Sequence, residues 1–483
     1  MQYPYYIRFL LLVVWVVACK SSEKVANEPS NERTAIPSVQ HGWDIYTAGT
    51  YRYGPSIIVN EDQSIDVWFA AEGDRHGDRL DFFAKDEQHL ALRIAESSDK
   101  VAQKFDITKP FYALSVMVPT WHSTSSSVRL SLYKWNRSYD ISLAQEPMKS
   151  IYFENIKDNS ELMLIDENMF PAGEYIWVLS EAKGTPGIWF SNLPHGSATN
   201  YWNGEIRQSG NFESSCLLEK SSGVYYWDKV VYRHSNDGGK TWTPDEVVLT
   251  PTDGGRDEFS TCDPGVVKYG DYYYLAYTST EDIGMVDNDL YLCRARTPRG
   301  TWEKWNGNGW GGMPQPVIEF TGNSKMFGVG EPSMVIVNDT LYMYYSWNDV
   351  APETTTTRVA TAPILNENWP ALLTHHGTAI NKSAIKGSDH IDVKYRTDLK
   401  LFYALHTASR FSKEAHLLLW ESKDGIHFKK AGVITEKLQP YLHNCGWGGD
   451  QFGHVNPRKP TYVGYAYGEK WGAWNTHWHR LQF

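Results

Sequence analysis

Two segments of the chain are nearly alike, and each places an acidic residue before a proline at the start of an expected strand. DPGVVKYGDYYYLAYTS begins at Asp263 and EPSMVIVNDTLYMYYSW begins at Glu331. A third segment, HIDVKYRTDLKLFYALHT from His390, repeats the rhythm with Asp392 and without the proline. Two neighbouring carboxyl groups can perform acid–base hydrolysis, because one keeps a proton to donate while the other is ionised and activates water. The matched acidic residues therefore predict such chemistry wherever the fold brings them together.

The spacing of the segments predicts a fold that does so. Asp263, Glu331 and Asp392 follow one another at intervals of roughly 60 to 70 residues, and a fifth unit is expected at the same distance, from His454. Short aromatic and β-branched runs end at Gly, Asn, Asp or Pro, and the chain carries no long amphipathic helix. A repeat of this length with about four short strands is typical of a β-propeller blade. Inner strands start at the mouth of the central channel, so Asp263, Glu331 and Asp392 are expected to converge there.

A separate motif also favours a propeller. SNDGGKTW, from Ser235 to Trp242, matches the Asp-box pattern Ser-x-Asp-x-Gly-x-Thr-Trp. In this turn the Asp side chain caps backbone amides and the Trp packs between blades. The motif indicates the fold and says nothing of the reaction.

The first unit of the repeat is expected at Gly54, in GPSIIVNEDQSIDVWFAAEG. The interval from Gly54 to Asp263 is about three times as long as the others, which predicts an insertion of roughly 150 residues in the first blade. The predicted architecture is all-β: a five-bladed β-propeller of residues 41–73 and 224–483 with a β-sandwich inserted over 74–223. Carbohydrate-binding modules often have this sandwich architecture, and the insert carries three candidates for stacking on sugar rings, Trp121, Trp135 and Trp202, for which packing in the core is the alternative.

The propeller rhythm, with CDPGVV and GVGEPSMVIV, resembles the arabinanase- and xylosidase-like hydrolases of glycoside hydrolase family 43 and its relatives. The resemblance covers the part of the chain outside the insert. It implies hydrolysis with inversion, using an Asp on blade one as general base, an Asp on blade two that tunes and orients, and a Glu on blade three as general acid. By position, Asp263 would be the tuning residue and Glu331 the acid. The chain departs from the pattern at Gly54, which stands where the base is expected.

Two acidic residues are candidates for the missing base. Asp228 is expected to begin the third strand of blade one, on the same face as the starts of the inner strands. Asp44, in HGWDIY, lies just before the first inner strand. Asp228 is preferred, and a structural capping role is the alternative for both. Further residues are candidates for binding sugar hydroxyls or stacking on sugar rings, with packing as the alternative role for each: His390, Asp392, His443, Arg256 and Trp347.

The N-terminus resembles an export signal over residues 1–19. Arg8 precedes an apolar run of ten residues, Phe9 to Ala18, which is too short to span a bilayer because spanning takes about 20. The run ends in VVAC, which resembles a bacterial lipobox with Cys19 as the lipidated residue; a plain secretory signal is the alternative. Residues 20–40 are polar and predict a flexible tether. We therefore expect lipid anchoring to the outer membrane of a bacterial cell envelope.

The amino-acid composition limits the classes of molecule that the protein is expected to bind. Lys and Arg number 46 against 57 Asp and Glu, a formal charge of −11, and no basic run occurs, which excludes a nucleic-acid partner. The 20 Trp and 30 Tyr favour strands and sugar-binding surfaces. Carbohydrate is the expected ligand.

Three hypotheses follow for the function. The first is hydrolysis of glycosidic bonds in a poly- or oligosaccharide, which requires no cofactor, although a structural Ca²⁺ in the channel is compatible with it. The second is a propeller glycoside phosphorylase or sialidase-like enzyme, which would need a phosphate pocket or an Arg cluster that the sequence does not show. The third is a non-catalytic surface glycan-binding protein, which Gly54 in the place of the base would fit.

Overall fold

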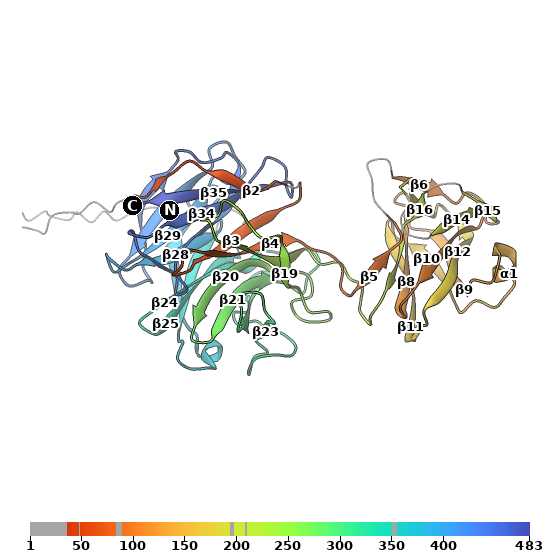
Figure 1. Cartoon of the computed structure of the whole chain (residues 1–483), viewed down its shortest axis with the longest axis horizontal. Coiled ribbons are helices and arrows are strands. Elements are labelled where there is room, and N and C mark those ends of the chain that lie inside the picture. The colour runs from red at the N-terminus through yellow and green to blue at the C-terminus, as the bar shows by residue number, and fades with distance from the viewer. Residues whose placement is uncertain (1–35, 48, 84–88, 194–197, 208–209, 350–354) are drawn as a thin grey trace, which may run out of the picture. The chain divides into compact units, whose positions relative to one another are not determined.

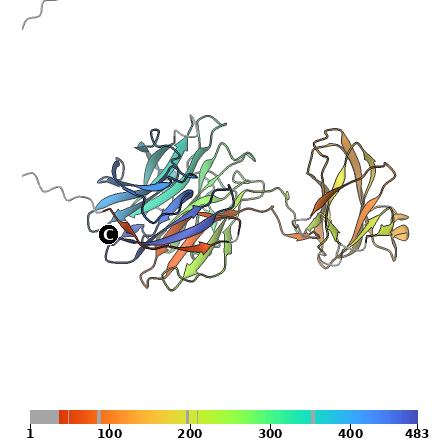
Figure 2. The same cartoon turned by 90° about the horizontal axis from the view of Figure 1, so that it is seen from above.

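The computed structural model describes residues 36–47, 49–83, 89–193, 198–207, 210–349 and 355–483. The regular secondary structure of these residues is almost entirely β-strand, with one short α-helix, α1 (Tyr139–Leu143), and one 3-10 helix, η1 (Trp369–Leu372) (Figure 1, Figure 2). The predicted all-β class is thus confirmed. Among the described residues no helix is long and apolar enough to cross a membrane. The signal and Cys19 lie outside the described residues, as does most of the expected tether.

Five mainly antiparallel sheets contain the repeated segments, and in each of them the strands of the repeat pair with one another in chain order. Sheet 1 comprises β3 (Arg52–Val59), β4 (Ile65–Glu72), β18 (Asp228–Ser235) and β19 (Glu246–Leu249). Sheet 2 comprises β20 (Cys262–Tyr269), β21 (Tyr272–Ser279), β22 (Asp289–Ala295) and β23 (Glu303–Lys304). Sheet 3 comprises β24 (Gly328–Val337), β25 (Thr340–Asn348), β26 (Thr356–Pro363) and β27 (Thr374–Asn381).

The last two sheets each take in an additional segment. Sheet 4 comprises β28 (Ile391–Arg396), β29 (Leu401–Ala408), β30 (His416–Ser422) and β31 (Lys429–Ile434), with β33 (His454–Val455) parallel to β28. Sheet 5 comprises β32 (Leu442–Trp447), β34 (Thr461–Tyr467) and β35 (Asn475–Gln482), with β1 (Ser38–Val39) and β2 (Trp43–Tyr46) both paired to β35. Segments from both ends of the described chain therefore close one sheet.

The first strands of the five sheets contact one another in a closed ring, in the order β3, β20, β24, β28 and β32. We call these five the inner strands. Apolar side chains fill the spaces between successive sheets; Val267, Ile336 and Leu341, for example, share one buried cluster. The expectation that the fifth unit begins at His454 is wrong, because β32 is the inner strand there and His454 lies beyond it. The segment LHNCGW lacks the acid–proline signature of β20 and β24, so the sequence pattern does not identify β32 as an inner strand.

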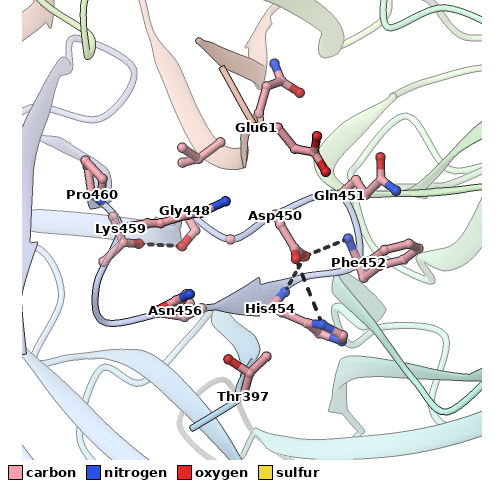
Figure 3. Close-up of a pocket in the computed structure, with 15 residues that line it drawn as sticks. Glu61, Thr397, Gly448, Asp450, Gln451, Phe452, His454, Asn456, Lys459 and Pro460 are labelled. Carbon is pink, nitrogen blue, oxygen red and sulfur yellow. Dashed lines mark hydrogen bonds and ion pairs between the residues drawn. The ribbon is translucent and has the colours of Figure 1, made fainter. Parts of the chain in front are cut away.

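One end of the ring is crossed by the segment 448–455. Asp450 organises it by accepting the backbone N–H groups of Phe452 and His454, both at 2.9 Å (Figure 3). Carbonyl oxygens of residues 449 to 453 accept amides from near the ends of the four other inner strands, those of Val59, Lys268, Ile336 and Tyr395. The hollow in Figure 3 is lined by this segment and contains none of Asp228, Asp263 and Glu331. Those three carboxyl groups lie at or near strand starts, away from this segment.

Close approach between inner strands leads to a stability prediction. A Cβ atom added to the buried Gly446 would lie 1.6 Å from the carbonyl oxygen of Pro55, so β32 and β3 must separate to admit it. We expect Gly446→Ala to lower the free energy of unfolding by about 3 kcal/mol, the upper part of the range for overpacked cores. Gly309→Ala is the matched control, since no atom lies within 4 Å of its added Cβ, and it should change little. Chemical denaturation measures both, and equal stabilities would contradict the close packing.

The strands between β4 and β18 form three separate sheets. One has four strands: β11 (Ser160–Phe170), β8 (Phe111–Val118), β17 (Ser214–Leu217) and β5 (Arg79–Asp81). The second has six: β10 (Lys149–Ile156), β9 (Ser126–Lys134), β12 (Gly173–Lys183), β7 (Val101–Ile107), β14 (Thr199–Trp202) and β15 (Glu205–Ile206). The third has three: β16 (Asn211–Phe212), β13 (Gly187–Ser191) and β6 (Leu90–Arg93). A core of its own, including Phe105, Leu114 and Trp177, joins them.

The Asp-box prediction is confirmed at the level of the turn. Asp237 accepts the backbone N–H groups of Lys240 and Thr241 at 3.0 and 2.9 Å. The ring of Trp242 packs edge-on against Trp478 of sheet 5, with centroids 5.2 Å apart. The motif thus joins sheets 1 and 5 and has no part in the carboxylate site described below.

Candidate active site

Four of the five inner strands carry a β-bulge at their start, and each bulge holds a residue of positive φ. These residues are Gly54 (+56°), Asp263 (+49°), Glu331 (+54°) and Asn444 (+38°). The left-handed conformation costs a non-glycine residue about 1–2 kcal/mol, and such strain gathers at functional sites where the surroundings impose it. Three of the four positions therefore accept strain in order to aim a polar side chain.

The bulges bring their residues together around Asp263. Asn444 Nδ2 donates a hydrogen bond to Asp263 Oδ1 at 3.2 Å. A Cβ atom at Gly54 would lie 3.1 Å from the same oxygen. The carboxyl group of Glu331 is near enough for its charge to raise the pKa of Asp263. The predicted convergence of Asp263 and Glu331 is thus seen in the geometry, and Gly54 leaves room for the Asp263 carboxyl where a side chain would crowd it.

Asp263 holds a proton at neutral pH. Burial raises the pKa of its carboxyl to about 8, and the charges of Glu331 and Asp228 act in the same direction. The hydrogen bonds from Cys262 and Asn444 oppose that rise without cancelling it. The protonated Asp263 carboxyl thus lies close to Glu331.

Asp228 is the third carboxyl group of the site beside Asp263 and Glu331. It is buried, and it begins β18 as the sequence predicts. It pairs with Glu72 at the end of β4, which places it at the same end of sheet 1 as the bulge at Gly54. Tyr53 and Ser260 donate their hydroxyls to it, at 3.4 and 3.1 Å. Burial raises the pKa of Asp228 to about 6 despite these donors, so the group is largely ionised at neutral pH.

Glu331 is held by the ends of two second strands. Its backbone N–H donates to Thr278 Oγ1 at 2.8 Å, and its Oε2 accepts the Ser346 hydroxyl at 2.6 Å. Two cations lie near it. Burial lowers the pKa of Lys382 to about 8, with the Glu331 charge acting against that shift. Burial likewise lowers the pKa of Arg410, which forms an ion pair with Asp389.

Several buried polar atoms in this region have no hydrogen-bond partner among the described residues. They are Nδ1 of His390, Nδ1 of His443 and Oδ1 of Asn444. Burial lowers the pKa of both histidines, so both are neutral at neutral pH. Unpaired buried polar atoms are costly, at about 1–3 kcal/mol each, and a hydroxyl-rich ligand would satisfy them. His390 and His443, both predicted from the sequence as sugar-binding residues, lie in this region.

The remaining sequence candidates lie elsewhere or have other partners. Asp392 accepts from Ser333 and the Trp447 amide and pairs with Lys394, so it joins three inner strands. Trp347 is buried, with the Arg358 guanidinium 3.7 Å above its ring.

Arg256 and Asp44 form their ion pairs and hydrogen bonds with residues other than the three carboxyl groups of the site. Arg256 pairs with Glu281 and Glu319, at 3.1 and 3.0 Å. Asp44 lies on β2, which β34 and β35 separate from the inner strand, and it accepts the hydroxyl of Tyr467 and pairs with His477. The structure does not bring Asp44 to the other carboxyl groups.

Four residues of the site were not predicted from the sequence: Tyr53, Lys382, Arg410 and Asn444. A usable signal exists for two of them. Lys382 directly follows β27, the fourth strand of sheet 3, and Arg410 follows β29, the second strand of sheet 4, by two residues. In an antiparallel sheet the second and fourth strands end on the side where the inner strand starts. Residues just after the second and fourth strands are therefore candidates in any sheet of this kind.

One further group of described residues could hold a metal ion: His76, Asp253 and Glu258. None of them belongs to the carboxylate cluster. Within that cluster, Asp263 is protonated at neutral pH and Lys382 and Arg410 bring positive charge, which makes it a poor cation site. The arrangement is suited to proton transfer: an ionised carboxylate, a protonated carboxyl and a third carboxyl lie together in a buried setting.

Comparison with known proteins gives distant similarities. No family model matches the sequence. No curated protein matches it either. Among solved structures, a family 117 glycoside hydrolase of the marine bacterium Zobellia galactanivorans is 14% identical over 54% of this chain and 73% of its own, with a TM-score of 0.38. An α-L-arabinofuranosidase of Podospora anserina in complex with cellotriose is 12% identical over 55% of this chain and 84% of its own, with a TM-score of 0.36. An endo-arabinase of Bacteroides thetaiotaomicron is 13% identical over 53% of this chain and 86% of its own, with a TM-score of 0.38.

Proposed function

We propose that the protein is an exported glycoside hydrolase that cleaves glycosidic bonds in a poly- or oligosaccharide. The observation that carries the proposal is the meeting of Asp228, Asp263 and Glu331 in one buried cluster, two of them on strained bulges. Glycoside hydrolysis needs two carboxyl groups in different protonation states, and burial keeps the pKa values of Asp228 and Asp263 apart at about 6 and about 8.

In this mechanism Asp228 is the general base and Glu331 the general acid. Asp228 is ionised and surrounded by hydroxyl donors, so it can take a proton from water. Glu331 protonates the leaving oxygen, drawing on the proton that Asp263 stores beside it. Water attack opposite the leaving group gives inversion, and nuclear magnetic resonance of the first-formed anomer tests that outcome.

The proposal is tested by incubating the full chain with plant and algal polysaccharides and measuring new reducing ends. Release of reducing sugar supports hydrolysis. The second candidate function is non-catalytic glycan binding, which Gly54 favours because it removes the side chain from one of the four bulges. Binding by isothermal titration without any release of reducing ends would establish that alternative and refute hydrolysis.

The architecture that we propose is a five-bladed β-propeller with a β-sandwich inserted in its first blade. The closed ring of inner strands supports five blades. The separate core of the intervening sheets supports an independent insert. Together with the sequence pattern, these features are consistent with domains at 41–73 plus 224–483 and at 74–223.

Removal of the insert should leave a folded propeller. Replacing residues 74–223 by a short Gly/Ser loop is feasible because Glu72 pairs directly with Asp228 in sheet 1, so the two cut ends are neighbours. We expect a cooperative thermal transition by circular dichroism in the shortened protein. A melt without cooperativity would refute the proposed domain boundary.

We propose in addition that Cys19 carries a lipid that anchors the protein to the outer membrane. The apolar run ending in VVAC supports it. Cys19→Ala should move the protein from the membrane fraction to the soluble fraction of the envelope, with export retained. A variant that stays with the membrane after a salt wash would contradict lipidation.

A further inference from the structure

An exposed tryptophan stands at the edge of the carboxylate site. Trp471 is 76% exposed, the highest fraction among the large apolar side chains that the structure describes. It lies in the loop between β34 and β35, followed by Gly472 in a turn of positive φ (+74°). The loop is tied down just beyond, where the Trp474 amide donates to the carbonyl of Thr50 at 3.0 Å.

A continuous series of rings connects Trp471 to the carboxylates. Trp471 meets the buried Trp474 at a centroid distance of 4.8 Å and Phe411 at 5.6 Å. Both of these contact His443, at 4.7 and 4.6 Å. His443 in turn lies 5.4 Å from Tyr53, whose hydroxyl bonds to Asp228. The rings come from four separate segments of the chain, and we call them the aromatic wall.

The wall has two ends of different character. At the inner end, Tyr53 and His443 are part of the buried polar cluster. At the outer end, Trp471 rests on Trp474 and Phe411 and keeps most of its surface in water. One intervening ring, His443 or Trp474, separates Trp471 from Tyr53. A sugar unit held at the carboxylates is therefore beyond the reach of Trp471, whereas the next unit of a chain comes over it.

Such an exposed ring has a plain chemical partner. Tryptophan offers a large rigid apolar face, and sugar rings present a face of C–H groups that packs on it. A lone apolar side chain on a surface needs no explanation. Trp471 differs because ring contacts link it to Tyr53, whose hydroxyl donates to Asp228, so this exposed ring belongs to the surroundings of the carboxylates.

We propose that Trp471 forms a second sugar subsite, so that the substrate is an oligosaccharide of at least two units whose unit next to the cleaved bond stacks on this ring. This inference rests on the proposed function of the carboxylate cluster. It makes Trp471 a residue that selects chain substrates over single sugar glycosides.

The test compares Trp471→Ala with the wild type on two substrates of the same sugar: the oligosaccharide found in the polysaccharide screen and the nitrophenyl glycoside of one unit. We expect kcat/KM on the oligosaccharide to fall about tenfold, the effect of one aromatic stacking contact, and kcat/KM on the nitrophenyl glycoside to stay within twofold. Trp471→Phe keeps a ring and should retain most of the activity. Leu365→Ala is the matched control, an apolar side chain that is 71% exposed on another loop, and it should change neither value.

Equal losses on both substrates, or none on either, would overturn the subsite. A wrong assignment of the carboxylate site is recognised by a different measurement. In that case Glu331→Gln would hydrolyse the oligosaccharide at the wild-type rate. Where the screen yields no substrate, titration with neutral oligosaccharides of two to six units, prepared by partial acid hydrolysis of plant and algal polysaccharides, tests the subsite directly. Binding that Trp471→Ala weakens supports it, and binding that is unchanged or absent refutes it.

Discussion

Replacing Glu331 by glutamine is expected to lower kcat on natural oligosaccharides by about 10²–10⁴, the usual effect of a positioned general acid. Glutamine has nearly the same shape, and its amide oxygen can still accept the Ser346 hydroxyl that now bonds to Glu331. It cannot give a proton to the leaving oxygen. Substrate binding should therefore persist while turnover is lost, which steady-state kinetics and titration measure together.

The leaving group separates the acid role from a general structural one. A nitrophenyl glycoside needs little protonation as it departs, so the loss in Glu331→Gln should be much smaller on that substrate. Glu303→Gln is the matched control, since Glu303 is half-exposed and pairs with Arg294 on the outer strands of sheet 2, and it should have wild-type activity. Equal losses on both kinds of substrate would show that Glu331 is not the acid.

Replacing Asp228 by asparagine is expected to lower kcat by about 10²–10⁴ on natural and activated substrates alike. A good leaving group does not help when no base activates the water. Asp44→Asn is the informative control, because Asp44 was the other candidate for the base and the structure places it on an outer strand. It should leave turnover unchanged.

The pH profile of the wild type follows from the same assignment. The base must be ionised, and the pKa of Asp228 is raised to about 6, so kcat/KM should fall as the pH drops through that value. The pKa of Asp263 is raised to about 8, and the stored proton is lost as the pH rises through that value. We expect a bell-shaped profile with its optimum between these limits. Activity that keeps rising below pH 5 would contradict Asp228 as the base.

The local pattern of the sequence was enough to predict the inner strands that begin near Asp263, Glu331 and Asp392. Alternating aromatic and β-branched residues between turn-formers specify strands locally, and a regular repeat of such strands specifies how they stack. The acid–proline signature also located two of the three site carboxyls. Asp228 was predicted because an antiparallel third strand starts at the same end as the first, which is a rule of topology that needs no coordinates.

The tertiary structure decided what surrounds those carboxyls. Asn444 lies on the inner strand of sheet 5, and Lys382 and Arg410 follow strands of sheets 3 and 4. A position after a strand is a local feature, but contact with the cluster depends on how these distant segments pack. Gly54 was predicted as a gap, but the structure shows that the Asp263 carboxyl lies against it. The protonation of Asp263 likewise depends on burial and on charges from other strands. Strand type and repeat length are written in neighbouring residues, whereas desolvation and charge proximity arise only when distant segments pack together, and these set the chemistry of the site.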